Sequence, residues 1–191
     1  MTASEVQPKS PRRRDAILQA LDDALRELPY SQVTIEDIAS RAGVGKSTIY
    51  RWWKHKSELV LELFKDRTQV VFDFDFSQSL AYNLSQQLIK LSYSLNSHIG
   101  RALLVAMSEN RMQSADFFRQ YLRPRREQTL VLIRLAIQRG EIEAHYDFEL
   151  MLDSLYAPIH YHTVFFNQQP TSAYIEALVR QTLAPIQRSS L

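Results

Sequence analysis

Residues 34–56, TIEDIASRAGVGKSTIYRWWKHK, constrain the fold more than any other part of the chain. Thr34 is placed to cap a helix, with Asp37 three residues later as the acidic partner of a capping box. Apolar residues then recur at helical spacing as far as Ala42, and Gly43 supplies the left-handed residue that ends a helix. The first half of the stretch therefore predicts a short helix with one buried face, followed by a glycine turn.

The second half predicts another short helix, which begins after Gly45. Its apolar positions, Ile49 and Trp53, lie four residues apart and face a small core. Polar and basic residues, among them Ser47 and Arg51, fall on the opposite face at 3.6 residues per turn. Two short helices joined by a glycine turn, the second one polar and basic outside, form a helix-turn-helix. In that motif the second helix presents its N-terminal residues to base edges in the major groove of DNA.

Charge is clustered in the same stretch. From Arg41 to Lys56 the chain has five Lys or Arg residues and no Asp or Glu. Phosphate contacts supply most of the non-specific affinity for DNA, so this cluster is typical of a nucleic-acid surface. The net charge of +2 over 191 residues would not indicate one by itself. The absence of cysteine excludes disulfides and thiolate metal sites.

This stretch resembles the DNA-binding segment of the TetR family of bacterial transcriptional regulators. The family pattern reads roughly T-x-x-x-I-A-x-x-A-G-V-S-x-x-T-[LI]-Y-x-x-F-x-x-K. The sequence matches it at Thr34, Ile38, Ala39, Ala42, Gly43, Val44, Thr48, Ile49, Tyr50 and Lys56. Gly45 replaces the usual Ser and Trp53 the usual Phe. Gly is a tolerable N-cap, and Trp is a larger side chain in the same core position, so both departures fit the motif.

The resemblance implies which side chains contact DNA. Those expected to face bases are Lys46, Ser47, Thr48 and Arg51, and those expected to hold phosphates are Thr34, Tyr50, Trp52 and Lys56. One recognition helix reads only a few base pairs. A homodimer that places two such helices in successive major grooves of a partly palindromic operator is therefore expected.

Two alternatives from other classes remain open at this point. Residues 43–48, GVGKST, copy the end of the nucleotide-binding P-loop, G-x-x-x-x-G-K-[ST]. The first glycine of that motif would fall at Ser40, and the preceding residues are patterned as a capped helix rather than a buried strand. A P-loop enzyme would be recognised by nucleotide binding. A small-molecule-binding or adaptor protein without DNA affinity would be recognised by its failure to be retained on DNA. We expect no enzyme and no cofactor.

The rest of the chain is helical by its apolar periodicity and has no convincing strand. Helical segments begin near residues 10, 57, 80, 98, 114, 148 and 171. Pro124 should kink or split the segment 114–139. The predicted fold is all-α with about nine helices. A three-helix helix-turn-helix domain over residues 1–56 is followed by a larger helical domain for ligand binding and dimerisation over residues 57–191.

The family resemblance also assigns tasks to this second domain. Its last two helices, about 148–166 and 171–186, would pair with their copies as a four-helix bundle. Helices between about 58 and 140 would enclose the site of an unknown small organic effector, and such sites are apolar with a few placed polar groups. The candidates to line it are Tyr93, Met107, Arg111, Phe118, Tyr121, Tyr156 and His160. Effector binding would tilt the helix that follows residue 57 and change the separation of the two DNA-reading ends.

No metal site is expected, because His160 and His162 lie two positions apart and point to different sides of a helix. The first 30 residues lack the continuous apolar core of a secretory signal. No apolar run approaches the ~18 residues of a membrane-spanning helix. The sequence therefore predicts a cytoplasmic protein with no membrane partner.

Overall fold

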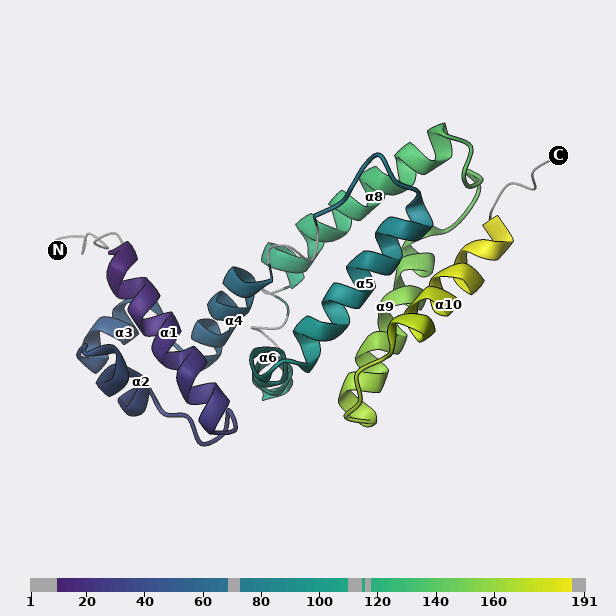
Figure 1. The fold of residues 1–191 in the computed structure, drawn as a ribbon. Helices are drawn as coiled ribbons and strands as arrows, with labels where there is room; N and C mark the ends of the chain where they lie inside the picture. Colours follow the sequence, from purple (N-terminus) through teal and green to yellow (C-terminus); the bar gives the residue numbers. More distant parts are fainter. Residues whose placement is uncertain (1–9, 69–72, 110–114, 116–117, 187–191) are drawn as a thin grey trace.

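The computed structural model of the chain describes residues 10–68, 73–109, 115 and 118–186, and its regular elements are all helices (Figure 1). In chain order they are α1 (Pro11–Glu27), α2 (Ile35–Ala42), α3 (Lys46–Trp52), α4 (Lys56–Arg67), α5 (Leu80–Asn96), α6 (His98–Glu109), the π-helix η2 (Phe118–Leu122), α8 (Arg123–Gln138), α9 (Phe148–Phe165), α10 (Ser172–Leu183) and the 3-10 turn η3 (Ala184–Ile186). The prediction of an all-α fold is confirmed.

Helices α1, α2 and α3 form a small unit at one end of the molecule, here called the head (Figure 1). Thr34 Oγ1 accepts a hydrogen bond from the Asp37 backbone N–H at 3.1 Å, which begins α2. Gly43, with a φ of 65°, ends it. The Asp37 carboxylate, which a capping box would direct back to the Thr34 N–H, binds Arg41 Nε at 3.0 Å. Local cap chemistry therefore sets the bounds of α2 as predicted.

Helix α4 joins the head to the rest of the molecule. It begins at Lys56 with His55 as N-cap, so Ser57 lies in its first turn instead of capping it. Its Leu59 and Leu63 are fully buried, and its Glu62 accepts a hydrogen bond from Trp53 Nε1 at 2.5 Å. The first turns of α4 thus share the core of the head.

The remaining helices form the second part of the molecule, here called the regulatory part after the role that the sequence predicts for it. Helix α5 lies at its centre and packs against α6, α8, α9 and α10 (Figure 1). Pro124 splits the predicted segment 114–139: the π-helix η2 ends at Leu122, and Pro124 stands in the first turn of α8. Proline is accepted there because the N–H that it lacks has no partner in a helical first turn.

The head is fastened to the regulatory part through a buried carboxylate. Asp22 of α1 is 3% exposed. One of its oxygens lies 2.6 Å from His98 Nε2 at the start of α6, and the other lies 3.5 Å from an Arg67 nitrogen of α4. Arg26 approaches it at 3.3 Å. Since a buried charge is tolerated only when it is paired, these contacts fix how α1 sits against α4 and α6.

The end of α4 is fastened separately. The Thr68 and Tyr121 hydroxyls lie 2.5 Å apart, and the Tyr121 ring packs edge-on against Phe64 at 6.1 Å between centroids. The Arg125 guanidinium lies 3.5 Å from the centre of the same ring. Tyr121 stands in η2, so this π-helix, where the backbone departs from regular α geometry, holds the end of the connecting helix.

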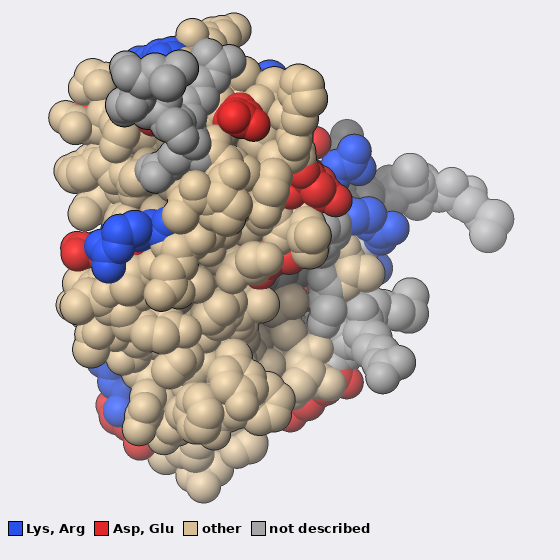
Figure 2. Space-filling model, turned by 90° about the vertical axis from the view of Figure 1, so that its right-hand side faces the viewer, with Lys and Arg blue, Asp and Glu red and all other residues tan. Residues whose placement is uncertain are grey.

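One side of the regulatory part, formed by α9 and α10, is largely uncharged (Figure 2). Along α9 the exposed positions that follow one line are Leu150, Ser154, Ala157, Tyr161 and Val164. Their steps of four, three, four and three residues repeat as in the seam of a coiled coil. We call this line the α9 seam.

No helix among the described residues has both the length and the apolar character needed to cross a membrane.

Candidate nucleic-acid interface

Helix α3 has one buried face and one exposed polar face. Ile49 is 0% exposed and Trp53 2%, and these two side chains anchor the helix in the head. Among the residues expected to contact DNA, Lys46, Ser47, Tyr50 and Arg51 are exposed, and Thr48 is half-buried. The structure therefore presents these side chains together on the outside of the second helix of a helix-turn-helix, where they can reach a groove.

The Lys46 ammonium donates a hydrogen bond to Glu36 Oε1 at 2.8 Å, and both side chains are more than half exposed. Glu36 raises the pKa of Lys46, and Lys46 lowers that of Glu36. Solvent-exposed ion pairs of this kind contribute little stability. Lys46 can therefore exchange Glu36 for a DNA phosphate or base at small cost.

Arg51 and Trp52 lie together at the end of α3. The Arg51 guanidinium stands 5.6 Å from the centre of the Trp52 ring, and the two tryptophans, Trp52 and Trp53, pack edge-on at 5.6 Å. Trp52 Nε1 is buried and has no acceptor among the described residues. The indole N–H would have to turn outward before it could hold a phosphate.

Lys56, which the family resemblance assigns to a phosphate contact, also makes structural hydrogen bonds that the sequence pattern does not predict. Its ammonium donates hydrogen bonds to the carbonyl oxygens of Tyr30 and Val33, each at 2.7 Å, and lies 4.0 Å from the centre of the Tyr30 ring. Partial burial lowers its pKa. These contacts tie the start of α4 to the loop between α1 and α2, so two of the three ammonium hydrogens are already used.

The GVGKST segment does not have the surroundings of a P-loop. The helix α2 precedes it, residues 43–45 form the turn, and residues 46–48 begin α3, a helix of 7 residues. A P-loop follows a buried strand and opens a longer helix.

Two family profiles match the chain. The profile described as "Bacterial regulatory proteins, tetR family" matches residues 17–63. The profile described as "Tetracyclin repressor-like, C-terminal domain" matches residues 79–182. The chain belongs to the TetR family. It is therefore a DNA-binding transcriptional regulator, as its helix-turn-helix predicted.

Relatives described as HTH-type transcriptional regulators match 90% or more of the chain. The uncharacterised HTH-type transcriptional regulator YdeS of Bacillus subtilis is 28% identical over 193 residues, which cover 100% of this chain and 98% of YdeS. The HTH-type transcriptional regulator AqdR of Rhodococcus erythropolis is 25% identical and covers 90% of this chain and 84% of AqdR.

Solved structures share the fold. The TetR family transcription regulator SCO0332 has a TM-score of 0.72 at 22% identity, covering 93% of this chain and 100% of that one. SmeT, the repressor of the Stenotrophomonas maltophilia multidrug efflux pump SmeDEF, has a TM-score of 0.63 at 20% identity, covering 97% of this chain and 93% of SmeT.

The predicted effector-site residues of this TetR-family chain separate into interior and surface positions. Tyr121 is 3% exposed, the Tyr156 hydroxyl is buried and Met107 is half-buried. Tyr93 is 60% exposed and His160 is also exposed, so neither lies in the interior as expected. Apolar neighbours occupy the inward faces of their helices, and positions 93 and 160 are turned outward. Arg111 and the side chain of Phe118 lie outside the described residues.

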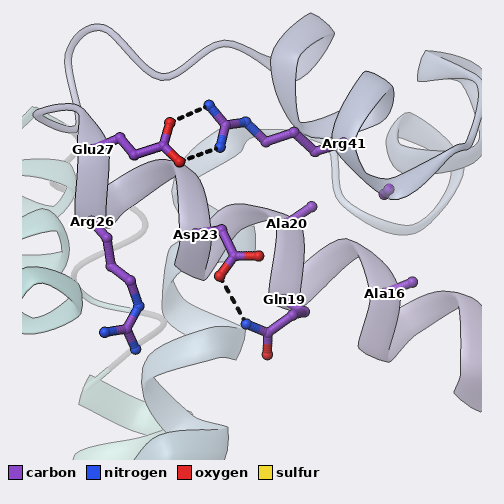
Figure 3. Close-up of a pocket in the computed structure, with 8 residues that line it drawn as sticks. Ala16, Gln19, Ala20, Asp23, Arg26, Glu27 and Arg41 are labelled. Atoms are coloured by element: carbon purple, nitrogen blue, oxygen red, sulfur yellow. Dashed lines mark hydrogen bonds and ion pairs between the residues drawn. The ribbon is translucent and has the colours of Figure 1, made fainter.

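A groove of about 500 Å³ lies between α1 and α2 (Figure 3). Its charges balance, with Asp23 and Glu27 against Arg26 and Arg41. Arg41 binds both Glu27 oxygens at 2.7 and 3.0 Å, and this pair joins α2 to α1. The basic residue Arg41, counted in the cationic cluster of the sequence, is thus neutralised within the head and does not extend the α3 surface.

The Arg41–Glu27 ion pair should be detectable as a lowered pKa of Glu27. Arg41 lowers the pKa of Glu27. A carboxyl whose pKa is lowered by folding stabilises the native state above its unfolded pKa of about 4.3, and the contribution is lost as the pH falls through the folded value. We therefore expect Arg41→Gln to raise the Glu27 pKa toward its ordinary range in an NMR titration and to make stability less dependent on pH below about 4.3. Arg26→Gln, which removes a groove arginine that pairs with Asp22, should leave the Glu27 pKa unchanged. An unchanged Glu27 pKa in Arg41→Gln would contradict the pairing.

Proposed function

We propose that this TetR-family regulator is a ligand-responsive repressor that binds a partly palindromic operator as a homodimer in the cytoplasm. The observation that carries the proposal is the exposed polar and basic face of α3. The opposite face of this helix is buried in the core of the head, so the polar face is the one that can contact DNA. Residues 1–56 would read DNA and residues 57–191 would regulate. Helix α4 serves both, since its first turns belong to the core of the head and its end binds Tyr121.

The proposed base contacts are Lys46, Ser47, Thr48 and Arg51, and the proposed phosphate contacts are Thr34, Tyr50, Trp52 and Lys56. Thr34 uses its hydroxyl oxygen as a cap acceptor and keeps its hydrogen for a phosphate. Lys56 already donates two of its three ammonium hydrogens to backbone carbonyl oxygens, so it would donate the third to a phosphate.

The α9 seam supports the homodimer. Leu150 is 61% exposed, Tyr161 52% and Val164 53%, on a face with few charges. An apolar line at coiled-coil spacing is suited to pack against the same line of a second copy, and two copies would place two heads on one operator.

Effector control would act through α4. An effector that binds one arrangement of the regulatory part more tightly than another would shift the position of α4, and with it the head. A typical coupling of ~1–3 kcal/mol would weaken operator binding by about 5- to 150-fold.

Selection of bound duplexes from a random pool tests the DNA-binding proposal and reports half-site sequence and spacing together. Two related half-sites about 34 Å apart are expected. Failure to retain any duplex at moderate salt would favour the adaptor alternative, and a single unpaired half-site would contradict the dimer.

Arg51→Ala should weaken binding to the selected operator by about 1–3 kcal/mol and relax specificity at one base position. The reason is the loss of a guanidinium that can bind a guanine with two hydrogen bonds. Arg134→Ala on α8, which also removes an exposed arginine, should leave affinity unchanged. Equal weakening on all sequences would instead identify Arg51 as a phosphate contact.

A further inference from the structure

A groove of about 410 Å³ lies at the junction between the head and the regulatory part. Residues of the head and of the turn into α4, among them Tyr50, Lys54 and Lys56, line one side of it. Ala106 and Glu109, at the end of α6, line the other. This junction groove is therefore the place where a side chain of α6 faces residues at the edge of the DNA-binding surface.

The two sides of the junction groove carry opposite charges. Lys54 is exposed on the head side, next to Lys56. Among the described residues that line the groove, Glu109 is the one carboxylate, and it is exposed. Glu109 forms no ion pair with another residue that the structure describes. Its negative charge is therefore not neutralised by a contact and acts across the groove.

The charge of Glu109 reaches two residues of the opposite side. Burial, together with this charge, raises the pKa of Tyr30 to about 12. Burial lowers the pKa of Lys56, and the same carboxylate acts in the opposite direction. The Coulomb energy depends on the distance between two charges and on their signs. A carboxylate that stabilises the Lys56 ammonium must therefore repel an anion that binds to this ammonium.

We propose that the Glu109 carboxylate of the regulatory part lowers the DNA affinity of the head, because it repels the backbone phosphate that Tyr50 and Lys56 hold. This inference rests on the proposed phosphate contacts and adds to them a residue outside the head. Phosphates are the same in every sequence, so the repulsion weakens binding to all duplexes and leaves specificity unchanged. It grows as the end of α6 approaches the head, so the position of α6 affects affinity without touching DNA.

Glu109→Gln tests the repulsion, because it removes the charge and keeps the size of the side chain. The full-length parent and variant are titrated with the selected operator and with an unrelated duplex, each at low and at high salt. At low salt the variant should bind both duplexes about three- to tenfold more tightly, as expected for two charges several ångströms apart at a protein surface. The gain should shrink at high salt, where the screening length is shorter.

Two control variants separate the charge from other effects of substitution. Glu109→Asp keeps the charge and should bind within about twofold of the parent. Glu143→Gln makes the same change at an exposed position in the loop between α8 and α9, which lies far from the head (Figure 1). It should leave both affinities unchanged. The melting temperature shows that each variant is folded.

Four results would overturn the inference. Unchanged binding by Glu109→Gln would mean that the charge does not reach the phosphate, and weaker binding would identify Glu109 as a residue that positions Lys56. An equal gain in Glu109→Asp, or a gain that does not depend on salt, would show that charge is not the cause.

Tyr50→Phe, measured in the same titrations, separates this inference from the proposed phosphate contacts. The loss of its hydroxyl should weaken binding to both duplexes about tenfold. If that loss is seen and Glu109→Gln changes nothing, the role of Glu109 alone is refuted. If Tyr50→Phe changes nothing, the phosphate contact of Tyr50 is refuted, whereas a salt-dependent gain in Glu109→Gln would still support the repulsion.

Discussion

Val164→Asp is expected to convert the proposed homodimer into monomers and to weaken operator binding by about 100-fold or more, because two linked heads bind far more tightly than one. Val164 lies in the α9 seam and is 53% exposed in the single chain. In a seam packed against its copy, the new carboxylate would be buried without a partner, which costs much more than the lost valine contact.

Val131→Asp is the matched control. Val131 is 46% exposed on α8, on the other side of α5 from α10 (Figure 1), so the same substitution there should change neither mass nor affinity. Light scattering gives the mass of each variant, and titration of labelled operator gives its affinity. A Val164→Asp protein that stays dimeric would place the interface elsewhere. A monomer with the affinity of the parent would show that the head does not need pairing.

The α9 seam also explains why this helix has more apolar residues than one core requires. Its positions Met151, Leu155 and Ile159 are at most 1% exposed and pack inward. Tyr161 and Val164 point outward at coiled-coil spacing. The sequence revealed the wide apolar character of the helix, but periodicity alone could not divide it between an inner face and an outer one.

Prediction from sequence was most successful where the cause is local. Three such features are the Thr34 cap, the left-handed Gly43 and the Gly45 N-cap. Each depends on residues within one helical turn, so each can be predicted from the local sequence. The buried faces of α2 and α3 follow in the same way from spacing. The bounds of both helices were therefore predicted closely.

Partners far apart in sequence could not be predicted. Asp22 meets His98 across 76 positions, and Lys56 meets the Tyr30 carbonyl across 26. Nothing in the pattern distinguishes these side chains from ordinary surface charges. The same limit applies to the residues predicted to line the effector site: the chemistry of Tyr93 suits such a site, but the fold leaves its side chain exposed.

Gly100→Ala is expected to destabilise the protein by about 3 kcal/mol, at the upper end of the cost of overpacking. A Cβ at Gly100 would lie 2.6 Å from both Leu95 Cα and the Leu95 carbonyl oxygen, and closer still to the Ser94 carbonyl oxygen. These are backbone atoms of α5 and cannot turn aside as a side chain can. Alanine favours a helix over glycine by about 1 kcal/mol, which is too little to offset the clash.

Gly45→Ala is the control for this substitution, because a Cβ there meets only Ser47 Oγ at an ordinary 3.5 Å. Its cost, that of a poorer N-cap, should stay below about 1 kcal/mol. Urea denaturation of both variants gives the comparison, and an unchanged midpoint for Gly100→Ala would mean that α5 and α6 do not approach so closely.

The substitution should also affect the position of the head, because Gly100 is two residues from His98. If α6 must move away from α5, the His98 contact with Asp22 moves with it, and the variant should lose the fixed position of the head before it loses the fold of the regulatory part.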